Sequence, residues 1–181
     1  MQSSRAFLKG LREIASEERY LFTPSDLAAL LPEMSDTSFK SLLSRLTSRG
    51  ELLRVCRGLY RPAWINPSHG WTLYHAAARL RAGTFTYLSL ESVLSEAGWM
   101  SQIPMQSIFL MTRGRGGDIN CGSLGRICFT HTTQNPEDVW EHLVYDPKRK
   151  LWVATAEQAL RDLRRTRRNL DLLLEEFHES V

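Results

Sequence analysis

The residue types that most often carry out chemistry are thinly spread along this chain. It has five histidines and three cysteines in 181 residues, and none of them stand at the spacing of a metal-binding pair such as CxxC. Cys121 and Cys128 lie too far apart for that motif. The histidines are His69, His75, His131, His142 and His178. The sequence therefore predicts no catalytic set, no metal site and no cofactor, and we expect no enzyme.

Two glycine-containing stretches have the composition of phosphate-binding loops. Residues 122–125 (GSLG) are similar to the Gly-Ser turn of nucleotidyltransferases, but that chemistry needs paired carboxylates to hold magnesium. The next acidic pair, Glu137 and Asp138, stands beyond a proline and at the wrong spacing. Residues 113–118 (RGRGGD) lack the Gly-Lys-Ser/Thr of a P-loop. They are interpreted as a flexible hairpin loop, and an RNA- or DNA-contacting loop is the alternative.

Positive charge is concentrated near the N-terminus. Residues 1–66 hold ten Lys/Arg and seven Asp/Glu, whereas residues 67–181 hold thirteen of each, so the whole net charge of +3 lies in the first third. Residues 36–62 alone contain six bases and two acids. A local excess of this kind attracts partners rich in phosphate.

Residues 36–50 (DTSFKSLLSRLTSRG) combine an apolar stripe with a face of small hydroxyls and bases. Phe39, Leu42, Leu43 and Leu46 have helical spacing, with Ser35 as the expected N-cap and Gly50 at the end. Short hydroxyl side chains allow close approach to a major groove, and Lys and Arg donate to base edges or phosphates. The residues predicted to contact DNA here are Thr37, Ser38, Lys40, Ser41, Ser44 and Arg45.

The flanking segments complete a recognisable order of elements. An amphipathic helix is expected over residues 5–18, and a second helix begins with Thr23 as cap and runs to residue 31. Two β-prone runs in residues 51–62 predict a hairpin, a wing that places Arg54, Arg57 and Arg61 against phosphates or a minor groove. The alternatives are a solvated helix face beside an ordinary hairpin, and a winged helix that binds only protein.

The expected fold class is α+β, with an N-terminal winged helix-turn-helix over residues 1–66 and a mixed α/β C-terminal domain over residues 67–181. Residues 66–70 (NPSHG) form the expected linker. In the C-terminal domain, Ser89 and Thr155 are expected to cap helices. Further helices are expected at 71–82 and 170–177, strands at 84–87, 107–112, 126–131 and 151–154, and either state at 140–145.

A second basic segment lies near the C-terminus. Residues 161–168 (RDLRRTRR) contain five arginines, and the simplest interpretation is a solvated helix end, where positive charge is favoured. The alternative is a docking patch for an acidic partner or for DNA phosphate. The partner-binding residues of that patch would be Arg161, Arg164, Arg165, Arg167 and Arg168.

Three features of the sequence indicate where in the cell the protein is located. It has no apolar run of about 18–20 residues, and the N-terminus lacks the pattern of a signal peptide. Three widely spaced cysteines favour reduced thiols. We therefore expect a cytoplasmic protein without a membrane partner.

Three stretches carry a family resemblance: residues 57–62 (RGLYRP), 87–99 (YLSLESVLSEAGW) and 153–163 (VATAEQALRDL). In these stretches and in their order, the chain resembles the AbiEi-type antitoxins, the transcriptional-regulator half of type IV abortive-infection toxin–antitoxin systems of phage defence. The likeness spans most of residues 20–165.

The resemblance implies an N-terminal winged helix that binds inverted repeats in its own promoter and represses the operon. It also implies a C-terminal domain that opposes a nucleotidyltransferase-like toxin, by contact or indirectly. The expected partners are thus double-stranded operator DNA and the cognate toxin, bound by a homodimer or by paired monomers. One alternative is a stand-alone winged-helix repressor whose C-terminal domain senses a ligand or dimerises. Another is a nuclease or nucleotidyltransferase relative, which would need clustered carboxylates.

Overall fold

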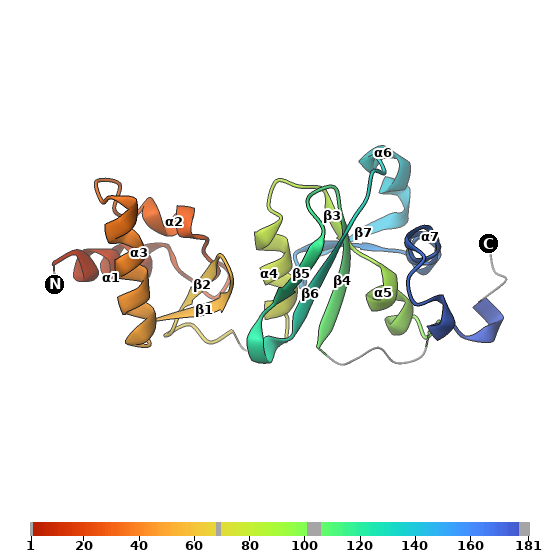
Figure 1. The fold of residues 1–181 in the computed structure, drawn as a ribbon, viewed down its shortest axis with the longest axis horizontal. Helices are drawn as coiled ribbons and strands as arrows, with labels where there is room; N and C mark the ends of the chain where they lie inside the picture. Colours follow the sequence, from red (N-terminus) through yellow and green to blue (C-terminus); the bar gives the residue numbers. More distant parts are fainter. Residues whose placement is uncertain (1, 68–69, 101–105, 178–181) are drawn as a thin grey trace. The chain divides into compact units, whose positions relative to one another are not determined.

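The computed structural model describes residues 2–67, 70–100 and 106–177, and shows a mixed α+β protein (Figure 1). The chain divides into two compact units, Met1–Thr72 and Leu73–Val181. The boundary expected between residues 66 and 67 lies a few residues before this division. Residues 68 and 69 of the expected linker lie outside the described residues.

The first unit contains three helices and a hairpin, whose bounds are α1 Gln2–Ile14, α2 Pro24–Ala28, α3 Asp36–Ser48, β1 Leu52–Cys56 and β2 Leu59–Pro62. Both predicted caps are confirmed. Thr23 and Asp26 form a reciprocal capping box at α2, and the Ser35 side chain accepts a hydrogen bond from the Ser38 N–H at α3. Gly50 follows α3 with a φ of 69°, a left-handed conformation that glycine adopts without strain.

Two helices are shorter than the sequence predicts. The helix expected over 5–18 ends at Ile14, and the Ser16 hydroxyl instead accepts a hydrogen bond from the N–H of Arg19, a local alternative to the helix. The helix expected to reach residue 31 ends at Ala28. There Leu31 N–H bonds to the Ala28 carbonyl in a tighter turn, because the following Pro32 disfavours the helical conformation before it.

The hairpin has the predicted Arg57-Gly58 tip, and Gly58 has a φ of 82°. Phe22, in the segment between α1 and α2, exchanges two main-chain hydrogen bonds with Tyr60, which adds a short third strand. The sequence did not predict this contact. A common core of buried side chains from α1, α3 and β1, including Phe7, Leu42 and Leu52, closes the unit.

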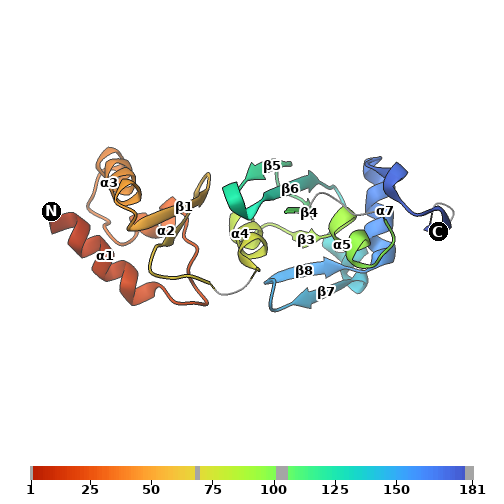
Figure 2. The ribbon, with the colours of Figure 1, turned by 90° about the horizontal axis from the view of Figure 1, so that it is seen from below.

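The second unit contains a six-stranded mixed sheet in the order β5-β6-β4-β3-β8-β7. The strands are β3 Thr86–Leu88, β4 Ser107–Thr112, β5 Gly117–Asn120, β6 Arg126–His131, β7 Leu143–Asp146 and β8 Leu151–Ala154. Helix α4 (Thr72–Leu80) lies on one side of the sheet, and α5 (Leu90–Glu96) and α7 (Ala156–Thr166) lie on the other (Figures 1 and 2). Both faces are therefore covered at β4, which is why Ile108 to Thr112 are all buried.

The glycine-rich stretch 113–118 is not a hairpin between its flanking strands, as the sequence predicted. Strands β4 and β6 are parallel neighbours, and β5 pairs with the far side of β6. The chain must cross the end of β6 to reach β5, and a side chain at Gly116 would come within 3.1 Å of the Phe129 carbonyl oxygen. Glycine thus permits a close backbone crossing.

Two further segments differ from expectation or resolve an ambiguity. Residues 140–145, for which the sequence left helix and strand open, begin as a 3-10 helix, η2 (Trp140–His142), and continue as strand β7. The prediction of a helix over 170–177 is wrong, because the chain forms two 3-10 turns there, η3 (Leu170–Leu172) and η4 (Glu175–Phe177). Between them Leu173 is extended and pairs with Met100, a tertiary contact that overrides local helix propensity. Among the described residues, none of the helices has the length and apolar character needed to cross a membrane.

Candidate nucleic-acid interface

Helix α3 presents its predicted contact face to solvent. Phe39, Leu42, Leu43 and Leu46 are at most 6% exposed, so they fix the rotation of the helix. The six predicted residues on the opposite side, Thr37, Ser38, Lys40, Ser41, Ser44 and Arg45, are all exposed. The rotation follows from helical periodicity, because the core side chains recur on one stripe.

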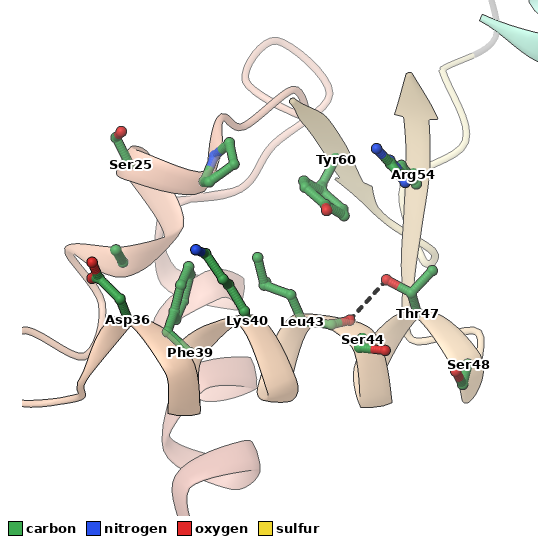
Figure 3. Close-up of a pocket in the computed structure, with 12 residues that line it drawn as sticks. Ser25, Asp36, Phe39, Lys40, Leu43, Ser44, Thr47, Ser48, Arg54 and Tyr60 are labelled. Atoms are coloured by element: carbon green, nitrogen blue, oxygen red, sulfur yellow. Dashed lines mark hydrogen bonds between the residues drawn. The ribbon is translucent and has the colours of Figure 1, made fainter. Parts of the chain in front are cut away.

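A groove of about 630 Å³ lies between α3, the start of α2 and the hairpin (Figure 3). Lys40 and Ser44 enter it from α3, and Arg54 and Tyr60 enter it from the paired strands. The groove is lined by Pro24, Ser25, Ala28, Asp36, Phe39, Lys40, Leu43, Ser44, Thr47, Ser48, Arg54 and Tyr60. Two bases and several hydroxyls therefore surround an open space with one acid, a composition that suits a phosphate-bearing chain.

The structure separates the predicted α3 residues into two flanks. Lys40 and Ser44 face the groove, whereas Ser38 and Arg45 line a second pocket beside the turn between α2 and α3. The two flanks are separated by roughly 100–160° around the helix axis. Ser41 donates its hydroxyl hydrogen to the Thr37 carbonyl at 3.0 Å.

The three hairpin arginines occupy different places. Arg54 pairs with Tyr60 and shares its face of the hairpin, and Arg57 is exposed at the tip. Arg61 pairs with Leu53, one position along, and therefore points to the opposite face. Its guanidinium donates to the carbonyl of Ile65. Of the predicted hairpin residues, the register brings only Arg54 into the groove.

The arginines of residues 161–168 are mostly committed to contacts within the second unit. Arg168 bonds to Glu91, which is fully buried, at 3.4 Å and to the Thr130 hydroxyl at 3.3 Å. Arg164 donates to the carbonyl of Phe177, and the Arg161 guanidinium lies 3.3 Å from His142 Nε2. Arg165 and Arg167 are exposed.

A buried carboxylate, which the sequence analysis missed, organises the second unit. Asp162 is fully buried, and its two oxygens accept hydrogen bonds from Tyr87, Ser89, Gln134 and Gln158 at 2.7–3.0 Å. Ser89 occupies the cap position of α5 as predicted, but its hydroxyl bonds to Asp162 and makes no side-chain cap bond. Burial and the neighbouring Asp162 carboxylate raise the pKa of the Tyr87 hydroxyl, which stays protonated and donates.

The sequence contains a signal for this network. In α7 the polar residues Gln158 and Asp162 share the stripe of Ala159, Leu160 and Leu163, four residues apart on the buried face. A polar pair on an apolar stripe indicates a buried network, since unsatisfied polar groups are costly there. Most of the network residues lie within residues 87–99 and 153–163.

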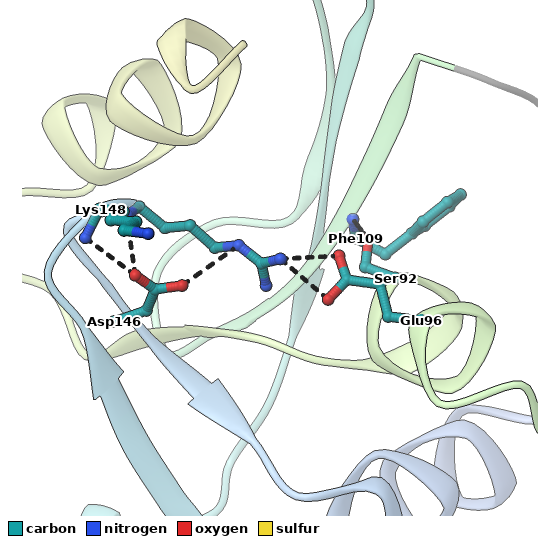
Figure 4. A network of polar contacts seen from close by, with 6 residues as sticks. Ser92, Glu96, Phe109, Asp146 and Lys148 are labelled. Atoms are coloured by element: carbon teal, nitrogen blue, oxygen red, sulfur yellow. Dashed lines mark hydrogen bonds and ion pairs between the residues drawn. The ribbon is translucent and has the colours of Figure 1, made fainter. Parts of the chain in front are cut away.

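A second polar cluster ties helices to the sheet (Figure 4). The guanidinium of Arg149 forms two bonds to the Glu96 carboxylate at 2.9 and 3.0 Å, lies 3.4 Å from Asp146, and stacks 5.0 Å from the centre of the Tyr74 ring. It therefore joins α4, α5 and the turn between β7 and β8. This arginine is a structural clamp, since its donors are directed to protein groups.

No side chains in the described ranges form a group of three or more His, Cys, Asp and Glu that could hold a metal ion. The three cysteines are buried and reduced. Burial, with Asp118 opposite it on β5, raises the pKa of Cys128 to about 11, so the thiol is protonated at neutral pH and a poor nucleophile. His69 and His178 lie outside the described residues.

Residues 11–63 match the family model of the AbiEi antitoxin transcriptional regulators. The resemblance inferred from the sequence is thereby confirmed for the stretch that contains α2, α3 and the hairpin. The match ends before residues 87–99 and 153–163, the other two stretches that carry the resemblance.

The fold has a counterpart among solved structures. The crystal structure of RV2827C protein from Mycobacterium tuberculosis superposes with a TM-score of 0.54 over 90% of this chain, at 15% sequence identity. At this low identity the likeness concerns the fold alone, and this chain spans only 60% of that protein. No curated protein matches the sequence.

Proposed function

We propose that this chain is a DNA-binding antitoxin of the AbiEi type, which represses its own operon and counteracts a nucleotidyltransferase-like toxin. The observation that carries the proposal is the exposed α3 face beside a groove with Lys40 and Arg54, within the residues that match the regulator family. Three helices, a hairpin and the Phe22–Tyr60 pairing are the parts of a winged helix-turn-helix.

In the proposed complex, α3 lies in the major groove of operator DNA. Thr37, Ser41 and Ser44 are exposed on α3, where short hydroxyls reach base edges. Lys40 and Arg54 hold the phosphates of a strand that passes through the groove between α3 and the hairpin. Arg57 at the hairpin tip adds a phosphate or minor-groove contact.

We assign opposition to the toxin to residues 67–181. The buried network around Asp162 supports a rigid unit, which leaves the exposed side chains to meet the partner. Within residues 161–168, Arg161, Arg165 and Arg167 are exposed, and Arg165 and Arg167 are the first candidates for contact with the partner because the Arg161 guanidinium lies beside His142. Arg161 and Arg164 are secondary candidates, and the contacts of Arg168 are directed inward.

The decisive experiment is a gel shift with the upstream region of the operon across a salt series, against a scrambled duplex. We expect selective binding that weakens steeply as salt rises, because phosphate contacts release counterions. A Lys40→Ala variant should bind weakly, whereas Lys9→Ala, an exposed lysine on α1 that lines neither pocket, should bind like the parent protein. Equal affinity of the parent for both duplexes would contradict the proposal.

The antitoxin role has its own test. If a nucleotidyltransferase-like toxin is encoded beside this chain, expression of the toxin alone should arrest growth, and co-expression of this chain should restore it. Unrelieved growth arrest, together with intact operator binding, would favour a stand-alone repressor with a ligand-sensing or dimerising C-terminal domain.

A further inference from the structure

The two edges of the six-stranded sheet differ in character. The β5 edge, Gly117–Asn120, carries exposed glycine, aspartate and asparagine beside a half-buried Ile119, and Asp118 is paired with Arg126 at 3.6 Å. Polar side chains of this kind protect an edge from pairing with another strand. The β7 edge, Leu143–Asp146, has the sequence LVYD and presents large apolar side chains instead.

The apolar side chains at the β7 edge are exposed on both faces of the sheet. Val144 is 67% exposed on one face, and Tyr145 is 47% exposed on the other. Beside Tyr145 the rings of Trp140 and Trp152 lie 4.4 Å apart between centroids, and Trp140 is 49% exposed. Large exposed apolar side chains on both faces of a sheet edge indicate a surface that another strand covers.

The main chain of β7 directs two residues outward. The carbonyl of His142 accepts a hydrogen bond from Thr155 N–H, so it points toward β8. Because main-chain groups alternate along an antiparallel strand, those of Val144 also point toward β8, whereas those of Leu143 and Tyr145 point away from the sheet. An added strand would bond to these two residues.

Only one two-fold arrangement uses both outward residues. With Val144 opposite Val144 of a second copy, Leu143 of each chain exchanges hydrogen bonds with Tyr145 of the other. Placing Tyr145 opposite itself would set Leu143 against Pro147, which has no N–H to donate. Placing Leu143 opposite itself would set Tyr145 against Glu141, which lies in a 3-10 turn and not in a strand.

The charges that flank β7 suit the same arrangement. Before the strand stand Glu137, Asp138 and Glu141, and after it stand Lys148 and Lys150, all five exposed. An antiparallel two-fold brings the acidic flank of one copy beside the basic flank of the other. The complementarity operates twice in a two-fold dimer, which distinguishes a second copy from an unrelated apolar partner.

We propose that the β7 edge pairs with β7 of a second copy of this chain, antiparallel about a two-fold axis through Val144, and so joins two sheets. The inference rests on the second unit alone and does not depend on the proposed DNA binding. It provides two copies of the N-terminal unit, the number that an inverted repeat requires.

A cysteine at the axis tests the register. In a non-hydrogen-bonded antiparallel pair, Cα atoms are about 4.5 Å apart, within the range that a disulfide spans. Val144→Cys should therefore form a disulfide-linked dimer upon mild oxidation of the dilute full-length protein, whereas Asn120→Cys on the β5 edge should not. The native cysteines are buried and add little background.

Charge at the same position tests the association in solution. By analytical ultracentrifugation, the parent protein should be a dimer. Val144→Asp and Val144→Lys should each raise the dissociation constant by about tenfold or more, because two like charges meet at the axis. An equimolar mixture of the two variants should dimerise again. Circular dichroism should show the same fold for each variant, since Val144 is exposed.

Three results would overturn the proposal. They are a parent protein that sediments as a monomer, a Val144→Asp variant that remains dimeric, and equal cross-linking of the Val144→Cys and Asn120→Cys variants. A monomer whose β7 edge instead binds the toxin would assign the patch to that partner and would equally overturn the two-fold dimer.

Discussion

The hairpin–α3 region and the segment 161–168 are both rich in basic residues, and the structure uses them differently. Lys40, Arg54 and Arg57 stand on a surface, around or beside an open groove. Arg164 and Arg168 are directed into their own unit, the latter to a buried glutamate. The contrast teaches that the density of arginines in a sequence does not identify a binding surface. Whether an arginine can bind a partner depends on the groups that its guanidinium contacts in the folded chain.

The same contrast separates two kinds of importance. In the first unit the polar residues of interest extend from a core to which they contribute little, so their loss should affect binding and spare the fold. In the second unit Asp162 and Glu91 are fully buried, and their loss should affect the fold first.

The largest expected effect is that of Asp162→Ala. The change leaves four buried donors without their acceptor, so the free energy of unfolding should fall by about 3–5 kcal/mol. Urea denaturation followed by circular dichroism measures it, on the transition of the second unit. Asp171→Ala removes an exposed carboxylate and should stay within about 0.5 kcal/mol of the parent. If Asp162→Ala lowered the free energy of unfolding no more than Asp171→Ala does, the hydrogen bonds to Asp162 would not stabilise the unit.

Next in size is the effect of Lys40→Ala on operator binding. Loss of a groove-lining base should cost about 1–3 kcal/mol of binding free energy at the specific site, with no change in thermal stability. Fluorescence anisotropy at fixed salt measures it, with Arg45→Ala as a comparison from the other flank of α3. A larger loss of binding free energy for Arg45→Ala than for Lys40→Ala would indicate that DNA passes along the flank of α3 that carries Arg45.

Arg168→Ala should lower the free energy of unfolding by about 1–2 kcal/mol, less than a fully buried pair, because the Arg168 side chain is 35% exposed and partly screened. Among the residues that the structure describes, Asn169 would then be the remaining hydrogen-bond partner of the Glu91 carboxylate. Arg165→Ala, an exposed neighbour, serves as the control in thermal or urea unfolding. Equal free energies of unfolding for the two variants would show that the Arg168–Glu91 pair does not stabilise the fold.

The smallest expected effect is that of Arg57→Ala. Loss of one phosphate contact should reduce the slope of log affinity against log salt by about 1, equally for operator and scrambled duplex. Arg61→Ala should change this slope less, because Arg61 points to the other face and bonds to Ile65. The opposite ranking would mean that DNA meets the face of the hairpin that carries Arg61.

Much of the fold could be predicted from the sequence where the cause is local. The capping residues Thr23, Ser35 and Thr155 bond to groups three residues away, and each marks the helix start that the structure shows. The strands at 107–112, 126–131 and 151–154 are confirmed to the residue, since their composition and flanking turns define them. The last helix failed because Leu173 pairs with Met100, more than seventy positions away along the chain.

The amino-acid sequence by itself determined the starts of the helices capped by Thr23, Ser35 and Thr155, the hairpin tip, the solvent-facing side of α3 and the excess of positive charge in the first third. These follow from interactions within a few residues or from periodicity. Only the tertiary structure decided that Arg54 shares a groove with Lys40 while Arg61 does not, that β5 crosses to the far side of β6, and that Asp162 collects four donors from three segments. Strand register and the packing of distant segments set these features, and the local sequence signals only that Gln158 and Asp162 share the buried stripe of α7, not which donors meet there.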